Sequence, residues 1–264
     1  MSKILSGLLL AGLLGTAVQA DMVRVEMGGG VWENELEGSI TSKGLAGIGP
    51  GFETFDTELL NYNKESKGYI WLNVKHPIPV LPNLRLEYAA IDYSGTSTES
   101  FIYDGTEYAA NAKTDLTLNQ FDVIMYYNIL DNTAWTTLDL GLDVKIIDSQ
   151  FTAAGDDVGT GNPETVDESE TLPVPMAYGR LRFEIPGIDI GVEGNMKYAA
   201  YKDSKVIDYA VKADYTLVDV LPVDIGLEVG YRYQKLDIDG EDFSIDTTAD
   251  IEIDGIFAGA VIKF

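Results

Sequence analysis

The chain offers few side chains that could perform covalent chemistry. It has one histidine, His76, and no cysteine among 264 residues. The absence of cysteine excludes thiolate nucleophiles, disulfides and zinc sites built on cysteine. His76 directly precedes Pro77 in a predicted turn and has no serine or aspartate pair close by in the sequence. A turn or interfacial histidine is therefore favoured over a general base, and we expect that the chain is not an enzyme and carries no cofactor.

Clustered acids are the second feature with possible chemistry. One cluster is formed by Asp237, Asp239, Glu241 and Asp242. Carboxylates in such density suit hard divalent cations, so these four residues are candidate metal ligands. They lack the spacing of a calcium-binding helical loop, and a hairpin with Asp-Gly turn chemistry explains them equally well. A second cluster is most simply a solvated loop: Asp156, Asp157, Glu164, Asp167, Glu168 and Glu170.

The overall charge narrows the choice of partners. The chain has 43 acidic and 18 basic residues, a net charge of −25. Such a charge argues against nucleic acid as a partner and favours a solvated surface or one that gathers cations. The run Gly28-Gly29-Gly30 is not followed by the Lys-Ser/Thr pair of a phosphate loop, and a bend or a close inner contact explains it better.

The first 20 residues have the three parts of a secretory signal peptide. Lys3 provides the positive start, an apolar run covers Ile4 to Leu14, and Val18-Gln19-Ala20 is a small-residue cleavage site. The apolar run is too short to span a membrane as a helix. We therefore predict two parts: residues 1–20 as a signal peptide, and residues 21–264 as a single exported domain.

The exported part alternates between apolar and polar residues with a period of two, the pattern of β-strands. In the clearest window, Leu138, Leu140, Leu142 and Val144 oppose Asp139, Gly141, Asp143 and Lys145. Ten such segments are predicted, at about 22–33, 66–76, 84–94, 115–127, 135–148, 173–185, 188–201, 206–217, 223–236 and 249–264. Pro173 and Pro175 are expected at a strand end or a sheet rim.

The connections between these segments differ in length on the two sides. Short turns are predicted at 77–83, 128–134, 186–187 and 218–222. Long loops are predicted at 34–65, 95–114, 149–172 and 237–248, with one short exception at 202–205. Short turns at one end and long loops at the other are the layout of outer-membrane barrels, and with ten strands both termini fall on the short-turn, periplasmic side.

Three features predict that the polar face points inward and the apolar face towards lipid. Glycines such as Gly28, Gly141 and Gly191 fall on the polar face, where a narrow interior needs room. Outward aromatic residues gather in two bands near the strand ends, as in membrane barrels. The polar face carries charges of both signs that can pair. The predicted lumen network consists of Arg24, Glu26, Arg85, Glu87, Asp122, Asp143, Lys145, Arg180, Arg182, Glu184, Glu193, Lys197, Glu228 and Arg232.

The last segment ends on Phe264, with Ile262 and Ala260 at alternate positions before it. This resembles the closing strand of bacterial outer-membrane proteins, and the resemblance implies that these residues are read by the barrel-assembly machinery. The exported chain as a whole resembles a family of small proteobacterial outer-membrane barrels without an assigned activity. The expected fold is thus an all-β, transmembrane, antiparallel up-and-down β-barrel of about ten strands, with eight to twelve possible.

Three functions remain open. The leading hypothesis is an outer-membrane protein with a structural or interaction role, a filled or narrow polar lumen and acidic extracellular loops, because ten strands lie near the size at which side chains fill a barrel. The alternative is a small cation-preferring pore. The third is a soluble periplasmic barrel that binds a hydrophobic ligand inside. The expected partners are outer-membrane lipid, lipopolysaccharide, the assembly machinery and divalent cations at the acidic loops, and no nucleic acid.

Enzymatic barrels offer a test of the prediction that the chain is not an enzyme. Proteases that resemble omptins pair aspartates with a histidine at the extracellular rim. His76 instead abuts a short turn, which the layout above assigns to the periplasmic side.

Overall fold

The computed structural model describes residues 23–43, 52–78, 80–220, 222–243 and 247–264. The predicted signal peptide, residues 1–20, lies outside the described residues. None of the helices in the described ranges is long and apolar enough to cross a membrane. The elements are β1 (Arg24–Lys43), β2 (Phe52–Asp56), η1 (Thr57–Leu60), β3 (Glu65–Lys75), β4 (Asn83–Ala89), β5 (Asp92–Thr96), β6 (Phe101–Tyr103), β7 (Thr106–Tyr108), β8 (Lys113–Thr133), β9 (Thr136–Asp156), β10 (Pro163–Ile185), β11 (Ile190–Tyr201), β12 (Ser204–Val220), β13 (Val223–Ile238), α2 (Gly240–Phe243) and β14 (Thr248–Lys263).

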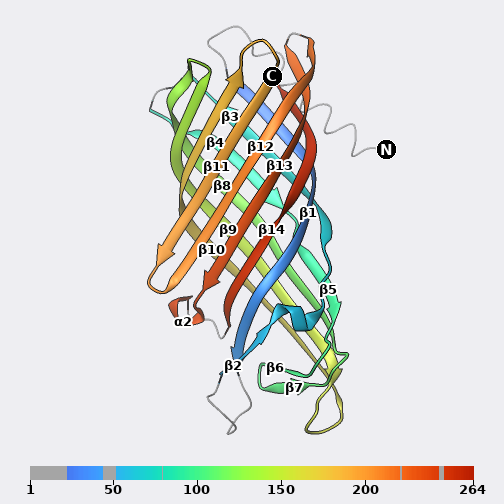
Figure 1. Cartoon of the computed structure of the whole chain (residues 1–264). Helices are drawn as coiled ribbons and strands as arrows, with labels where there is room; N and C mark the ends of the chain where they lie inside the picture. The colour runs from blue at the N-terminus through green and yellow to red at the C-terminus, as the bar shows by residue number, and fades with distance from the viewer. Residues whose placement is uncertain (1–22, 44–51, 79, 221, 244–246) are drawn as a thin grey trace, which may run out of the picture.

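Ten strand positions form one closed antiparallel barrel (Figure 1). Consecutive positions pair in sequence order, and β14 pairs with β1 from Glu26↔Lys263 to Thr41↔Thr248, which closes the ring. β5 follows β4 along the same side of β8, and β2 takes the place of β3 beside β1, so neither adds a position. The predicted all-β barrel of ten strands is confirmed.

The two ends of the barrel differ as the loop lengths predicted. Short turns join β3 to β4, β8 to β9, β10 to β11 and β12 to β13 at one end. The C-terminus lies at this end, where the Phe264 N–H donates to the Val25 carbonyl at 2.8 Å. The longer connections gather at the other end, with β6, β7 and α2 (Figure 1). The one short connection there, Lys202-Asp203 between β11 and β12, was also predicted.

Several predicted loops are instead strand, which is a correction. The predicted loop 149–172 is mostly β-structure, because β9 runs to Asp156 and β10 begins at Pro163. In the predicted loop 34–65, β1 continues to Lys43 and β2 follows. The predicted loop 95–114 contains the β6–β7 hairpin. The alternation continues in these stretches, but the apolar residues now lie on the inward face and the polar residues on the outward face. A search for apolar residues that stay on one face therefore misses these strands.

The reversal is clearest along β8. The outward side chains change from Asp115, Thr117 and Asn119 to Phe121, Val123 and Met125, while the inward ones change from Leu116 and Leu118 to Gln120 and Asp122. A strand in water hides its apolar face, and a strand in lipid exposes it. We call the part with apolar outward side chains the belt, and the part between the belt and the long connections the long-loop section.

The belt exposes large apolar side chains all around the barrel. Leu142 is 65% exposed, Ile256 62% and Val229 59%, whereas Asp139, Lys145 and Lys197 behind them are 0% exposed. The predicted aromatic bands are outward as well, with Tyr198, Tyr209 and Tyr231 towards the long-loop section and Tyr127, Trp135, Phe183, Tyr215 and Phe264 towards the short turns. The prediction that the polar face points inward is confirmed for the belt.

Pro173 and Pro175 lie inside β10 and not at its start. They pair with Ile146 and Val144 of β9. On the other side β11 pairs with β10 only from Ala177 to Ile185. The two prolines therefore do not lie at a strand end. They do lie at a sheet rim, the other position expected for them, because β10 pairs only with β9 at these residues. Proline lacks an N–H, so it is tolerated at such a free edge.

Candidate functional site, the charged interior of the barrel

The belt encloses a set of buried charged side chains contributed by seven neighbouring strands. Each strand places every second side chain inside, because successive residues of a strand point to opposite faces. The buried cations are Arg85, Lys145, Arg180, Arg182, Lys197 and Lys212, and the buried anions are Asp122, Asp139, Asp143, Glu193, Asp208, Asp214 and Glu228. Buried charges are tolerated only when they are paired, so the contacts between them decide how the interior is held.

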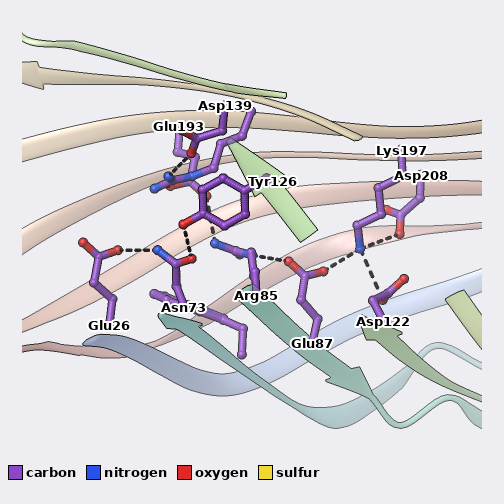
Figure 2. A network of polar contacts seen from close by, with 12 residues as sticks. Glu26, Asn73, Arg85, Glu87, Asp122, Tyr126, Asp139, Glu193, Lys197 and Asp208 are labelled. Atoms are coloured by element: carbon purple, nitrogen blue, oxygen red, sulfur yellow. Dashed lines mark hydrogen bonds and ion pairs between the residues drawn. The ribbon is translucent and has the colours of Figure 1, made fainter. Parts of the chain in front are cut away.

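A central cluster joins Glu87, Asp122, Lys145, Lys197 and Asp208 across the lumen (Figure 2). Lys145 Nζ lies 2.8 Å from Asp122 Oδ1 and 3.0 Å from Asp208 Oδ2. Lys197 Nζ lies 2.6 Å from Glu87 Oε2 and 3.2 Å from Asp122 Oδ2. The five side chains come from β4, β8, β9, β11 and β12. Lys145 and Asp122 lie on paired neighbouring strands, whereas the other three contacts connect strands that share no backbone hydrogen bonds.

A second cluster, the turn-side cluster, consists of Asp139, Arg180, Arg182, Glu193 and Asp214. Arg180 donates from Nη1 to Asp139 Oδ2 and from Nη2 to Glu193 Oε2, each at 2.7 Å. Arg182 donates from Nη2 to Asp214 Oδ2 at 3.0 Å and lies 3.6 Å from Glu193. One guanidinium spanning two carboxylates uses the fixed fork of arginine donors and orients both partners.

Arg85 connects the two clusters. Its Nε donates to Glu87 Oε1 at 2.6 Å, and its Nη1 lies 3.7 Å from Glu193 Oε1 (Figure 2). The guanidinium carbon also lies 4.8 Å from the ring centroid of Trp71, and Lys212 Nζ lies 4.1 Å from the same ring. The ring of Trp71 is therefore within cation–π distance of two cations and stabilises both.

Two glycines make room for these side chains, as their place on the polar face predicted. A Cβ atom at Gly28 would lie 2.5 Å from ring atoms of Trp71. A Cβ atom at Gly191 would overlap the guanidinium of Arg182. Glycine at both positions is thus a requirement of the crowded interior.

Asp143 differs from the other buried acids. It is 1% exposed, yet neither of its carboxylate oxygens has a hydrogen-bond partner among the described residues. Its strand neighbours on the inward face are Gly141 and Lys145, and Lys145 is already engaged by Asp122 and Asp208. Asp143 therefore brings an unsatisfied acid to the interior and contributes no cross-link.

Most of the predicted lumen residues lie in this interior, and one does not. Arg24 is exposed at the start of β1, which is a correction: the first residue of the strand lies beyond the inner ring of charges. Glu184 lies at the edge of the interior, since its side chain is 43% exposed although it pairs with Arg182 at 2.6 Å. Glu26 is half-buried and lies 3.5 Å from the amide of Asn73.

Sequence reasoning gave no role to the inward aromatic residues of the belt. Trp71 donates to Glu228 at 3.0 Å, Tyr69 donates to Glu228 at 2.8 Å and Tyr126 donates to Asn73 at 2.7 Å. Tyr69 and Trp71 alternate with apolar Ile70 and Leu72, so the period of two placed them on the polar face. Their hydrogen bonds to acids depend on neighbours far away in the sequence and could not be predicted.

The interior changes character in the long-loop section. It is filled by apolar and aromatic side chains, among them Phe55, Phe101, Tyr103, Tyr108 and Phe151. The rings are in contact, with centroids 5.2 Å apart for Phe55 and Phe101 and 4.5 Å apart for Tyr103 and Phe151. The β6–β7 hairpin brings three of these residues inside. A polar lumen is therefore correct for the belt and wrong for this section, which has a core like that of a water-soluble protein.

The cavity beside Trp71 and Arg85 is small. A cavity of about 50 Å³ adjoins Trp32, Trp71, Arg85, Lys212 and Arg232. This volume holds a few water molecules. Side chains therefore pack closely around this cavity in the belt, and the aromatic cluster fills the long-loop section.

The four candidate metal ligands do not come together. The described residues contain no group of three or more potential metal-binding side chains. Asp242 instead caps the β11–β12 turn: its Oδ2 accepts from the Ser204 hydroxyl at 2.8 Å and from the Ser204 and Asp203 N–H groups. Asp239 accepts from the Glu241 N–H, and Asp237 lies in β13. The prediction of a shared site for Asp237, Asp239, Glu241 and Asp242 receives no geometric support.

These contacts also set the acidity of Asp242. Partial burial acts to raise its pKa, but the hydrogen bonds from Ser204 and the nearby ammonium group of Lys202 outweigh this and lower the pKa below its ordinary value. The carboxylate is thus the form that docks α2 against the turn between β11 and β12.

His76 lies at the short-turn end, as the sequence predicted. Its Nδ1 accepts from the Ile78 N–H at 3.2 Å, and its Nε2 lies 3.0 Å from the Pro82 carbonyl oxygen. Both ring nitrogens are therefore used to shape the β3–β4 turn. This is the arrangement of a turn histidine.

No protein-family model and no curated protein matches the sequence. Among solved structures, the chain is similar to the outer membrane protease OmpT from Escherichia coli, with 12% identity, a TM-score of 0.53, and 93% of this chain and 99% of that chain covered. Weaker similarities are to the translocator domain of the autotransporter NalP from Neisseria meningitidis (14% identity, TM-score 0.38, 99% and 94% covered) and to the toluene transporter TodX of P. putida (9% identity, TM-score 0.32, 93% and 90% covered). At such identity the likeness to OmpT concerns the fold and carries no activity across. The chain therefore has the fold of a bacterial outer-membrane β-barrel.

Proposed function

We propose that the chain is an integral outer-membrane protein with a closed lumen, whose long-loop section faces the outside of the cell and interacts with other molecules there. The observation that carries this proposal is the double filling of the interior. Ion pairs connect opposite walls in the belt, and packed aromatic rings occupy the long-loop section.

The ion pairs favour a closed barrel for an energetic reason. An ion that crosses the belt must part Lys145 and Lys197 from Asp122 and Asp208, which leaves buried charges without partners. Breaking one partner from a buried pair costs about 3–5 kcal/mol. Barrels of about eight strands are just filled by side chains, and wide aqueous channels appear at about sixteen. Ten positions thus agree with a filled interior.

The exposed belt supports the membrane location. Apolar outward side chains between two aromatic bands match the hydrocarbon layer and its two interfaces. Lipid and lipopolysaccharide are the partners that this surface would meet. The outward alternation of Ala260 and Ile262 in β14, continued by Phe264 directly after the strand, leaves the terminal residues available to the assembly machinery.

The second candidate is a small cation-preferring pore. One observation favours it: within the part of the chain that the structure describes, seven acids are buried in the interior against six bases, and the carboxylate of Asp143 accepts no hydrogen bond. A lumen with surplus negative charge attracts cations. The soluble ligand-binding alternative is disfavoured, because it needs an apolar interior behind the apolar belt, where the buried residues are charged.

An enzymatic role has no support in the site. His76 is engaged in the β3–β4 turn, at the end opposite to the long connections. Six of the buried carboxylates of the belt are held in ion pairs: Asp122, Asp139, Glu193, Asp208, Asp214 and Glu228.

Conductance in a planar lipid bilayer tests the proposal. The protein is refolded in detergent, and folding is shown separately by heat-modifiable gel mobility. A folded protein that produces no current steps agrees with the closed lumen. Steady cation-selective steps whose size changes in Asp122→Asn would contradict it and establish the pore, and Asp115→Asn, outside on β8, is the control that should leave such steps unchanged.

A further inference from the structure

The β9–β10 hairpin carries a free strand edge. β10 pairs with β9 from Pro163 to Phe183, but β11 pairs with β10 only from Ala177 onward. Among the described residues no strand pairs with the second side of β10 between Pro163 and Met176. Figure 1 shows this hairpin reaching beyond the ends of β11 and β12. The edge therefore presents unpaired backbone groups in the long-loop section.

Two hydrogen bonds tell which backbone groups face the edge. The Glu184 N–H donates to the Trp135 carbonyl at 2.8 Å, and the Asn162 carbonyl accepts from the Asp157 N–H at 2.8 Å. The backbone N–H and C=O groups of the even-numbered residues of β10 thus point towards β9, and no register shift interrupts this pairing. Because the direction alternates, the odd-numbered residues Thr165, Asp167, Ser169 and Thr171 direct their N–H and C=O groups to the free edge.

The prolines mark one limit of this edge. Pro173 and Pro175 are odd-numbered, so the donors that they lack are edge donors and not ladder donors to β9. Natural sheets use proline in this way to prevent unwanted pairing. Residues 165–171 contain no such block, and no strand among the described residues uses their four edge-directed N–H groups and four edge-directed C=O groups.

The charge around the edge selects the kind of partner. The segment from Asp148 to Met176 contains no lysine, arginine or histidine. Its acids are Asp148, Asp156, Asp157, Glu164, Asp167, Glu168 and Glu170. A second copy of this chain would bring the same acids to the edge and be repelled. A strand with lysine or arginine at alternate positions would instead meet carboxylates on the sheet.

We propose that the free edge of β10, residues Thr165–Thr171, binds an extended basic segment of a partner protein, which adds to the sheet as a further strand. Backbone hydrogen bonds to the four odd-numbered residues provide affinity, and the acids provide selectivity for basic side chains. The inference deepens the proposed function, because it assigns the interacting surface, and it rests on the long-loop section facing outward.

The test uses the full-length protein folded in detergent micelles and a ten-residue peptide that alternates lysine and threonine as the probe. Ser169→Pro removes one N–H group that points to the free edge, as Pro173 and Pro175 already do along the same strand. Ser169→Ala is the matched control, because it keeps this N–H group. Binding is followed by fluorescence anisotropy of the labelled peptide. We expect saturable binding to the wild type and an affinity about tenfold weaker for Ser169→Pro, which corresponds roughly to the free energy of one lost hydrogen bond. The affinity for Ser169→Ala should stay unchanged.

Three results would overturn the inference. Absence of saturable binding is one. Equal binding to wild type and Ser169→Pro, with loss in Glu170→Gln, would mean attraction to the acids without strand addition. A dimer that forms through this edge and disappears in Ser169→Pro would identify a second copy as the occupant. Each result leaves the bilayer test of the closed lumen untouched, so the two proposals can fail separately.

Discussion

At the scale of single residues, two of the buried aspartates in the interior, Asp122 and Asp143, have opposite roles. Asp122 joins Lys145 and Lys197 in the central cluster. Asp143 is equally buried but has no hydrogen-bond partner among the described residues. Burial of a carboxylate without hydrogen bonds is unfavourable. Removal of a paired carboxylate is also unfavourable, because it leaves the buried cations without a partner.

Replacing each aspartate with asparagine separates these roles. We expect Asp122→Asn to lower the free energy of unfolding by about 3–5 kcal/mol, because two buried ammonium groups lose a partner. Asp143→Asn should leave the free energy of unfolding unchanged or raise it. Urea unfolding in lipid vesicles, followed by tryptophan fluorescence, measures both. Equal destabilisation by the two variants would show that Asp143 belongs to the network.

A single carboxylate at the surface offers a pH test. The pKa of Asp242 is lowered below its ordinary value of 3.8 in the folded protein. Its contribution to docking α2 is therefore present above that ordinary value and is lost as the pH falls through the folded one.

We expect the protection of the Asp203 and Ser204 amides, measured relative to their intrinsic exchange rate at each pH, to be lost as the pH falls from 3.8 through the lowered pKa of Asp242, because their acceptor becomes protonated. Hydrogen exchange read by NMR measures this. Asp242→Asn should show fast exchange at every pH. Protection that persists to pH 2, or that is retained in the variant, would contradict the assignment of Asp242 as the cap.

At the scale of elements, each long strand combines two environments. β9 exposes Leu140, Leu142 and Val144 in the belt and Gln150, Thr152 and Ala154 beyond it, while its inward residues change from Asp143 and Lys145 to Ile147 and Phe151. This change in polarity along one strand marks where the membrane ends on the side of the long-loop section.

Arginine substitutions on the outer face of β9 test this limit. Leu142→Arg should lower the free energy of unfolding in lipid by about 2–4 kcal/mol, because a charge enters the hydrocarbon layer. Ala154→Arg, on the same face beyond the belt, should change it by less than about 0.5 kcal/mol, as at an ordinary water-exposed site. Similar costs at both positions would refute a membrane boundary between them.

At the scale of the whole molecule, closure of β14 on β1 removes the free edges of the belt and brings the chain end to the short-turn side. The tips of the long connections, such as Val158, then lie at one end, and the short turns, such as the one following Thr133, lie at the other. Only one of these ends can face the outside of the cell.

Single cysteines establish which end this is, since the chain has none of its own. We expect a membrane-impermeant maleimide to label Val158→Cys in intact cells. The same reagent should label Thr133→Cys only after the outer membrane is broken. The reverse pattern would place the long-loop section in the periplasm and remove the basis of the proposed interaction role.

The sequence alone was sufficient for the barrel, its ten strand positions and the inward direction of the charged face. These follow from a period of two, which is a local property of each strand, and from the positions of turn-forming residues. It also placed His76 at the short-turn end and most of the network, from Arg85 to Arg232, inside.

Only the tertiary structure decided how these residues pair and where the barrel is closed. Lys197 reaches Glu87 across the lumen, a contact between residues 110 positions apart, and no local pattern encodes it. The aromatic core of the long-loop section was missed because its alternation has reversed polarity, and Arg24 was misplaced because the sequence does not show where the inner ring of charges ends. The free edge of β10 arises from the unequal lengths of β10 and β11, which becomes visible only when their register is known.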